Sequence, residues 1–120
     1  MSVKDDNYYA RLLRRKDVDD FVKLQEGLTR VIEPKTQKTL WLTPKQEMWC
    51  RKLAELKIQG EGHGILRKAA LAAGYGADCA TEENRNISAD RASTRNQHSN
   101  ACYLRVIEII RELHAENLNG

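Results

Sequence analysis

Polar side chains between residues 88 and 98 are the best candidates for chemistry in this 120-residue chain. Ser88, Arg91, Thr94, Arg95 and His98 recur at intervals of three or four residues, which places them together on one side of a helix. Arginine can form two hydrogen bonds with O6 and N7 of guanine, and hydroxyl groups can bind phosphate oxygens. The pattern predicts a DNA-binding face, and the alternative is an ordinary solvated helix surface.

Other basic residues precede this face in the sequence. Lys45, Arg67 and Lys68 could add contacts to DNA phosphates. Residues 43–120 nevertheless hold 11 basic and 10 acidic residues, and the whole chain has a net charge of only +3. Because affinity for DNA grows with the number of phosphates neutralised, we expect one copy to bind weakly and with marked salt dependence. Several linked copies would gain affinity through multivalency.

Metal binding has less support from the spacing of possible ligands. His98 and Cys102 lie four residues apart and could share a metal ion with Cys79 or His63. The three cysteines lack the paired spacing of zinc sites, and their odd number argues against a disulfide framework. We therefore expect reduced thiols and no bound metal or other cofactor.

Catalysis also has little support. Gly60, Gly62 and Gly64 are not followed by the Lys-Ser or Lys-Thr pair of a phosphate-binding loop. The acidic residues Asp78, Glu82 and Glu83, together with Asp90, could hold Mg²⁺ in a small nuclease, although adjacent acids in a polar loop are more often solvated. The expectation is a protein that is not an enzyme.

Several helices are predicted to position the DNA-binding face. Thr43 and Gln46 form the pattern of a capping box with Pro44 in the first turn, so a helix should begin there and continue to the glycines after residue 59. A second, alanine-rich helix is expected over 65–73. After a polar stretch at 76–87, Ser88 should cap one long helix that continues to about residue 118.

The N-terminal part is also predicted to be helical. Residues 5–16 form a short amphipathic pattern, and apolar residues from 18 to 32 continue at mostly helical spacing. The fold expected is therefore all-α, with an N-terminal helical assembly segment and linker at 1–42 and a helix-turn-helix domain with a long C-terminal helix at 43–120. The residues expected to support oligomerisation are Tyr8, Leu12, Phe21, Val22 and Leu28.

The segment Leu42-Thr43-Pro44-Lys45-Gln46-Glu47, followed by Ala69-Ala70 and Ala73-Gly74-Tyr75, resembles the small terminase subunit family of tailed bacteriophages. The resemblance extends over about residues 42–114. It implies a helix-turn-helix protein that assembles into a homo-oligomeric ring, recognises a packaging site on double-stranded viral DNA, and recruits the large terminase subunit with its ATPase and nuclease. The family has a short gap where this chain has the polar stretch 76–87, and its ring-forming helices follow the DNA-binding domain. We therefore expect residues 5–32 to provide the assembly surface here.

An alternative within the same fold class is a dimeric helix-turn-helix transcriptional regulator. The number of subunits in solution would separate a ring from a dimer. No apolar run approaches the length of a membrane span, and the first residues lack the apolar core of a signal peptide. The expected location is the cytoplasm, which for a phage protein is that of the infected host cell, with no membrane partner.

Overall fold

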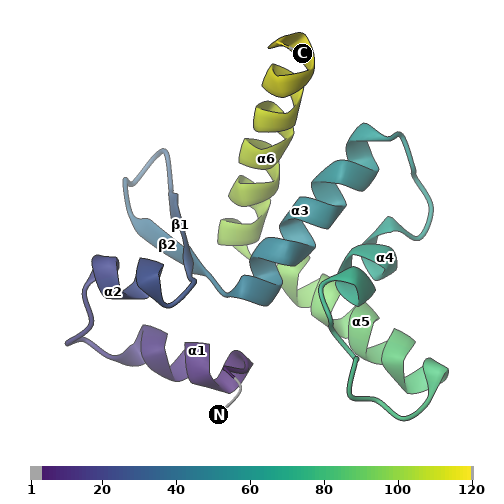
Figure 1. Ribbon diagram of the computed structural model, residues 1–120, viewed down its shortest axis with the longest axis horizontal. Coiled ribbons are helices and arrows are strands. Elements are labelled where there is room, and N and C mark those ends of the chain that lie inside the picture. The colour runs from purple at the N-terminus through teal and green to yellow at the C-terminus, as the bar shows by residue number, and fades with distance from the viewer. Residues whose placement is uncertain (1–3, 120) are drawn as a thin grey trace.

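The helix that begins after Thr43 is central to the fold in this computed structural model, which describes residues 4–119 (Figure 1). It is α3, Pro44–Ile58. The Thr43 hydroxyl accepts a hydrogen bond from the Gln46 backbone N–H at 3.3 Å, and the Gln46 side chain accepts one from the Thr43 N–H at 3.0 Å. The predicted capping box is therefore confirmed.

The other elements make the protein mainly α-helical, as the sequence indicated, with one small sheet. The elements besides α3, in chain order, are α1 (Asp6–Arg14), α2 (Asp20–Gln25), β1 (Thr29–Ile32), β2 (Thr39–Leu42), α4 (Ile65–Ala72), α5 (Glu82–Gln97) and α6 (Asn100–Asn119).

The helical prediction for residues 18–32 was wrong over its second half. α2 ends at Gln25, and Gly27, with a φ of 104°, turns the chain into β1. β1 pairs antiparallel with β2, with Thr29 opposite Leu42. Val31 is buried between exposed Arg30 and exposed Ile32, which is the alternation of a strand. Pairing with residues 39–42 across the hairpin loop therefore overrides the helical spacing of these apolar residues.

The prediction of one helix from Ser88 to residue 118 was also wrong. α5 begins at Glu82, because the Thr81 hydroxyl accepts a hydrogen bond from the Asn84 N–H at 3.1 Å and two acids occupy the first turn. It ends at Gln97. The Ser99 hydroxyl then accepts from the Cys102 N–H at 3.3 Å and begins α6 in a new direction (Figure 1). Much of the polar stretch 76–87 is thus the first part of a helix.

Two clusters of buried side chains hold these elements together. In the principal core, α3 packs against α6 and α4, and α4 packs against α5. Val31 of β1 and Leu42 of β2 belong to this core, so the hairpin packs with the helices that follow it. A smaller cluster joins α1 to the hairpin and contains Tyr9, Leu12 and Leu28.

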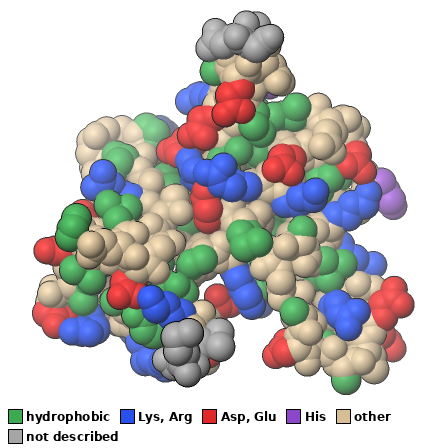
Figure 2. All heavy atoms as spheres, viewed as in Figure 1, with side chains coloured by type: hydrophobic (Ala, Val, Ile, Leu, Met, Phe, Trp, Pro, Cys, Tyr) green, Lys and Arg blue, Asp and Glu red, His purple; other side chains and the backbone are tan. Residues whose placement is uncertain are grey.

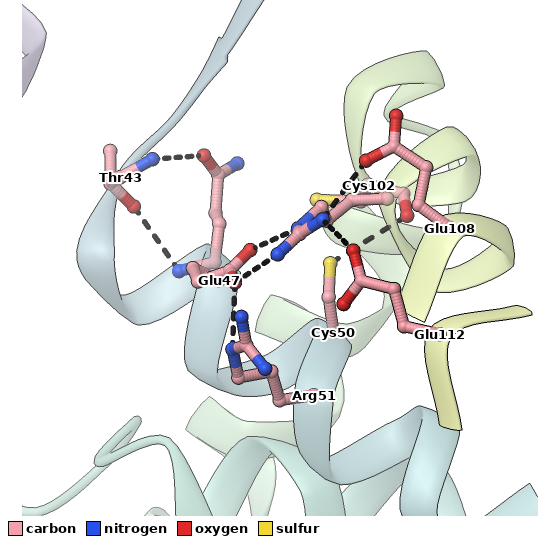
Figure 3. Close-up of polar contacts among 9 residues, drawn as sticks. Thr43, Glu47, Cys50, Arg51, Cys102, Glu108 and Glu112 are labelled. Atoms are coloured by element: carbon pink, nitrogen blue, oxygen red, sulfur yellow. Dashed lines mark hydrogen bonds and ion pairs between the residues drawn. The ribbon is translucent and has the colours of Figure 1, made fainter. Parts of the chain in front are cut away.

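An ion-pair network also joins α6 to α3 (Figure 3). Glu47 of α3 accepts from the Arg105 guanidinium of α6 at 2.7 and 2.9 Å, and both side chains are largely buried. Glu47 also pairs with Arg51 at 2.8 Å, while Glu108 and Glu112 bind the other side of Arg105. These contacts fix the base of α6, whose C-terminal half projects from the body of the protein (Figure 1).

None of the helices within residues 4–119 combines the length and the apolarity that crossing a membrane requires.

Candidate nucleic-acid interface

α5 has a buried side made mostly of small residues and an exposed side that contains larger polar residues. Its buried side consists of Ala89, Ala92, Ser93 and Asn96, which pack toward the other helices. The opposite side contains the five residues predicted from the sequence. Arg91, Thr94, Arg95 and His98 are exposed and Ser88 is half-buried, so the structure brings this set together on one surface. We refer to these five residues as the α5 face.

A buried hydrogen-bond chain orients the α5 face. The indole N–H of Trp49 in α3 donates to the Ser93 hydroxyl at 3.0 Å, and that hydroxyl donates to the backbone carbonyl of Leu66 in α4 at 2.6 Å. Ser93 therefore bonds α5 to two other helices at once. Sequence reasoning missed this residue. The available signal was a serine among alanines on what proved to be the buried side of α5.

Lys45 lies near the C-terminal part of α5 through Tyr75. Its ammonium group is 5.3 Å from the centre of the Tyr75 ring, and the Tyr75 hydroxyl accepts a hydrogen bond from the Asn96 amide at 3.4 Å. Burial raises the pKa of Tyr75, while the Asn96 hydrogen bond and the nearby positive charge of Arg95 act in the opposite direction. Lys45 therefore lies over the same buried phenol ring whose hydroxyl is bonded to Asn96 of α5.

Arg67 and Lys68, the other predicted phosphate contacts, already have acidic partners in the protein. Arg67 binds both carboxylate oxygens of Asp90 at 3.0 and 2.6 Å, and this holds the pKa of Asp90 below its usual value. Lys68 pairs with Glu61 at 2.8 Å. Asp90 is on α5 beside Arg91, so the Arg67–Asp90 pair lies along one edge of the α5 face.

The charges around the α5 face favour contacts at its centre and C-terminal end. Within residues 4–119, Arg91 and Arg95 form no ion pair, which leaves both guanidinium groups available to a ligand. Glu82 and Glu83 occupy the first turn of α5 and would repel phosphates there. On the side of the molecule seen in Figure 2, acidic and basic groups are interspersed, in keeping with the modest net charge.

The earlier start of α5 also extends this surface. Asn84 and Ile87 precede Arg91 by seven and four residues, so they lie on the same side of the helix, and both are exposed. Sequence reasoning left them out because it began the helix at Ser88. An asparagine can bind the N6 and N7 atoms of adenine, and an apolar side chain can contact the methyl group of thymine.

The possible metal ligands do not come together. Cys102 is buried beside Cys50, whose thiol donates to the Cys102 carbonyl at 3.6 Å (Figure 3), whereas His98 and His63 are exposed. In the part of the chain that the structure describes, no group of three or more His, Cys, Asp or Glu side chains is placed to hold a metal ion. The nuclease alternative built on Asp78, Glu82 and Glu83 therefore has no geometric support in that part.

The residues predicted to form an assembly surface divide into two groups. Leu12 and Leu28 are buried in the smaller cluster, and the half-buried Tyr8 donates a hydrogen bond to Glu26 at 2.8 Å. These three side chains are used within the chain itself. Phe21 and Val22 of α2 are exposed.

Comparisons with protein-family models, with curated proteins and with solved structures found no match to this chain.

Proposed function

We propose that this chain is a helix-turn-helix DNA-binding protein in which α3, α4 and α5 form the domain and α5 is the recognition helix. The observation that supports this most directly is the pair of exposed arginines, Arg91 and Arg95, one turn apart on α5 and without acidic partners among the described residues. The major groove of B-DNA is wide enough to admit a helix, and arginine is the residue that most often reads guanine there.

The surroundings of α5 fit this role. The Ser93 hydrogen bonds hold α5 at a fixed rotation on α3 and α4, so that the α5 face points outward. Lys45 on one side and Arg67 on the other would contact phosphates that flank the groove, with Lys68 beside Arg67 on α4. Phosphate contacts of this kind fix the position of a recognition helix, and base contacts then give the specificity.

The biological role we propose follows from the resemblance of residues 42–75 to small terminase subunits. In this role the chain binds a packaging site on double-stranded viral DNA as a homo-oligomeric ring and recruits the large terminase subunit in the cytoplasm of the host cell. α5 begins at Glu82, so the connection after Gly74-Tyr75 is shorter than the sequence indicated, and it is closer to the short gap of the family. A weakly charged single copy gains affinity from such an assembly.

DNA binding by Arg91→Ala and Arg95→Ala tests the role of α5. Fluorescence anisotropy with a labelled duplex should show a loss of about 5- to 150-fold in each variant, which corresponds to the about 1–3 kcal/mol expected for a specific arginine–base contact. A residue that contacts only phosphate should instead lower the slope of log K against log salt by about 1.

Arg14→Ala is the matched control, because Arg14 is an exposed arginine near the end of α1 and lies outside the α5 face. Circular dichroism should show unchanged helix content in all three variants. Wild-type affinity in both α5 variants at low salt would remove this helix from the proposed interface.

A dimeric regulator would use the same α5 face, so the mass of the full-length protein decides between the two roles. Native mass spectrometry that finds eight or more subunits supports the ring of the terminase family. A stable dimer supports the regulator and contradicts the packaging role.

A further inference from the structure

An apolar surface on α2 is not covered by the rest of the chain. Phe21 is 66% exposed and Leu24 is 44% exposed, and a spacing of three residues puts them on the same side of the helix. Exposed Asp20 lies next to Phe21 at the start of α2. We call Phe21 and Leu24 the α2 knob.

An open groove lies between α3, α5 and α6 on another part of the molecule. Trp49 and Leu53 of α3 line it, together with Tyr103 of α6, which is 62% exposed. Its volume is about 230 Å³. A cavity of about 150 Å³ lined by apolar side chains can bind benzene, so an aromatic ring fits this groove. The remaining lining residues are Lys57, Leu66, Asn96, Gln97, Val106, Ile107 and Ile110.

We propose that the α2 knob of one copy docks into this groove of a second copy. Charge favours this occupant, because the groove contains Lys57 and no acidic side chain, while Asp19 and Asp20 precede the knob. The cation of α2, Lys23, has its ammonium group 5.1 Å from the centre of the Trp41 ring. The size of the groove suits Phe21. Within one chain, α2 lies beyond the hairpin from α3 and α5, so the groove receives the knob of another copy (Figure 1).

This docking joins two different surfaces, and each copy presents both of them. Such a head-to-tail contact adds further copies until the assembly closes into a ring, or continues as a filament where the rotation does not close. The inference rests on the homo-oligomeric part of the proposed function and gives that assembly a specific interface. It is independent of DNA binding, and its test is carried out without DNA.

Two variants of the full-length protein remove one surface each. Phe21→Glu removes the knob and leaves the groove, whereas Tyr103→Glu adds a charge at the groove edge and leaves the knob. Both positions are exposed, and circular dichroism checks the fold. We expect each variant alone to become monomeric by native mass spectrometry. A mixture of the two should form a 1:1 dimer and nothing larger, because only one intact knob and one intact groove remain.

Met48→Glu is the control, because Met48 is an exposed apolar residue of α3 outside the groove, and this variant should assemble like the wild type. A second pair of variants tests the charge argument. Asp20→Lys and Lys57→Glu should each raise the dissociation constant of assembly at least tenfold. Both changes combined in one chain should restore the dissociation constant of the wild type.

The possible failures are distinguishable. A monomeric wild type at all concentrations contradicts both this interface and the proposed assembly. If the wild type assembles and the Phe21→Glu and Tyr103→Glu variants assemble equally well, the proposed docking is wrong, and the chain forms a homo-oligomer through another surface. Monomeric variants that do not recombine on mixing overturn the head-to-tail arrangement and indicate a symmetric contact instead.

Discussion

A single hydroxyl group at Ser93 sets the orientation of α5. It accepts from Trp49 and donates to a backbone carbonyl of α4, so both of its hydrogen-bonding roles are satisfied by other helices. The surrounding alanines allow the helices to approach closely but do not select one rotation of α5. The directional hydrogen bonds of Ser93 therefore fix the rotation of α5 about its axis, and this rotation keeps Arg91 and Arg95 on the outer side.

Ser93→Ala should destabilise the protein. The change leaves the buried indole N–H of Trp49 without its acceptor, at a cost of about 1–3 kcal/mol. The better helix propensity of alanine offsets about 0.5 kcal/mol of this. Urea unfolding followed by circular dichroism should show a net loss of about 1–2 kcal/mol in the free energy of unfolding.

Thr94→Ala is the control at the next residue, because the Thr94 hydroxyl is exposed and bonds only to the Asp90 carbonyl of its own helix. It should change stability by no more than about 0.5 kcal/mol. Equal stability of the two variants would mean that the Ser93 bonds do not contribute to the fold.

At the level of elements, the sequence predicted a helix start where several local signals coincide, and it missed elements that lack such a combination. The start of α3 was predictable because Thr43, Pro44 and Gln46 lie within four residues. The strand β1 was not, because its conformation depends on pairing with β2 across a turn. The break between α5 and α6 was missed because Thr81 and Ser99 are both good caps but lie in polar stretches where many residues can cap.

The same distinction holds for the candidate interface. Helical spacing alone was enough to group Ser88, Arg91, Thr94, Arg95 and His98 on one side of a helix. The partners of Arg67 and Trp49 lie 23 and 44 residues away in the sequence, so the spacing of residues held no information about them. Contacts of this kind are fixed by the packing of α4 and α3 against α5.

Arg105 adds polar contacts to the apolar packing between α3 and α6. Its side chain is held by Glu47 across the helix pair and by Glu108 and Glu112 on its own helix, and the bonds with Glu47 raise the pKa of the guanidinium. Arg105→Met keeps the apolar stem of the side chain and removes these bonds. We expect a loss of about 2 kcal/mol in the free energy of unfolding, since hydrogen bonds to charged groups contribute about 1.5–3 kcal/mol.

Arg111→Met, an exposed position on the same helix, should stay within about 0.5 kcal/mol of the wild type in the same urea titration. If the two arginine variants lose stability equally, the ion pairs with Glu47 are not what holds α6.

For the whole molecule, the two clusters of buried residues imply two levels of stability. The principal core includes all of the longer helices, whereas α1 is held by a small cluster around Tyr9, Leu12 and Leu28. Regions with few buried apolar contacts open at a lower free energy than the global unfolding. The N-terminal helices should therefore open while the α3–α6 body stays folded.

Hydrogen exchange measured by mass spectrometry tests this order. Amides of α1 should exchange at least tenfold faster than those in the middle of α3, after correction for intrinsic rates. Amides of β1 should exchange as slowly as those in the middle of α3, because Val31 lies in the principal core. Uniform protection across α1 and α3 would show that the protein unfolds as one cooperative unit.

At the edge of the α5 face, the Asp90 carboxylate would compete with an incoming phosphate for the Arg67 guanidinium. Asp90 presents two carboxylate oxygens to Arg67 in the geometry that a phosphate would offer, so an anion must displace it before Arg67 is free. Single anions from solution gain little by that exchange. If the chain binds DNA as we propose, a duplex would displace Asp90 in the same step as it contacts Arg91 and Arg95. In the DNA-binding role we propose, the cost of displacing Asp90 would be subtracted once from the many contacts with a duplex, whereas it would cancel most of the gain from a single anion.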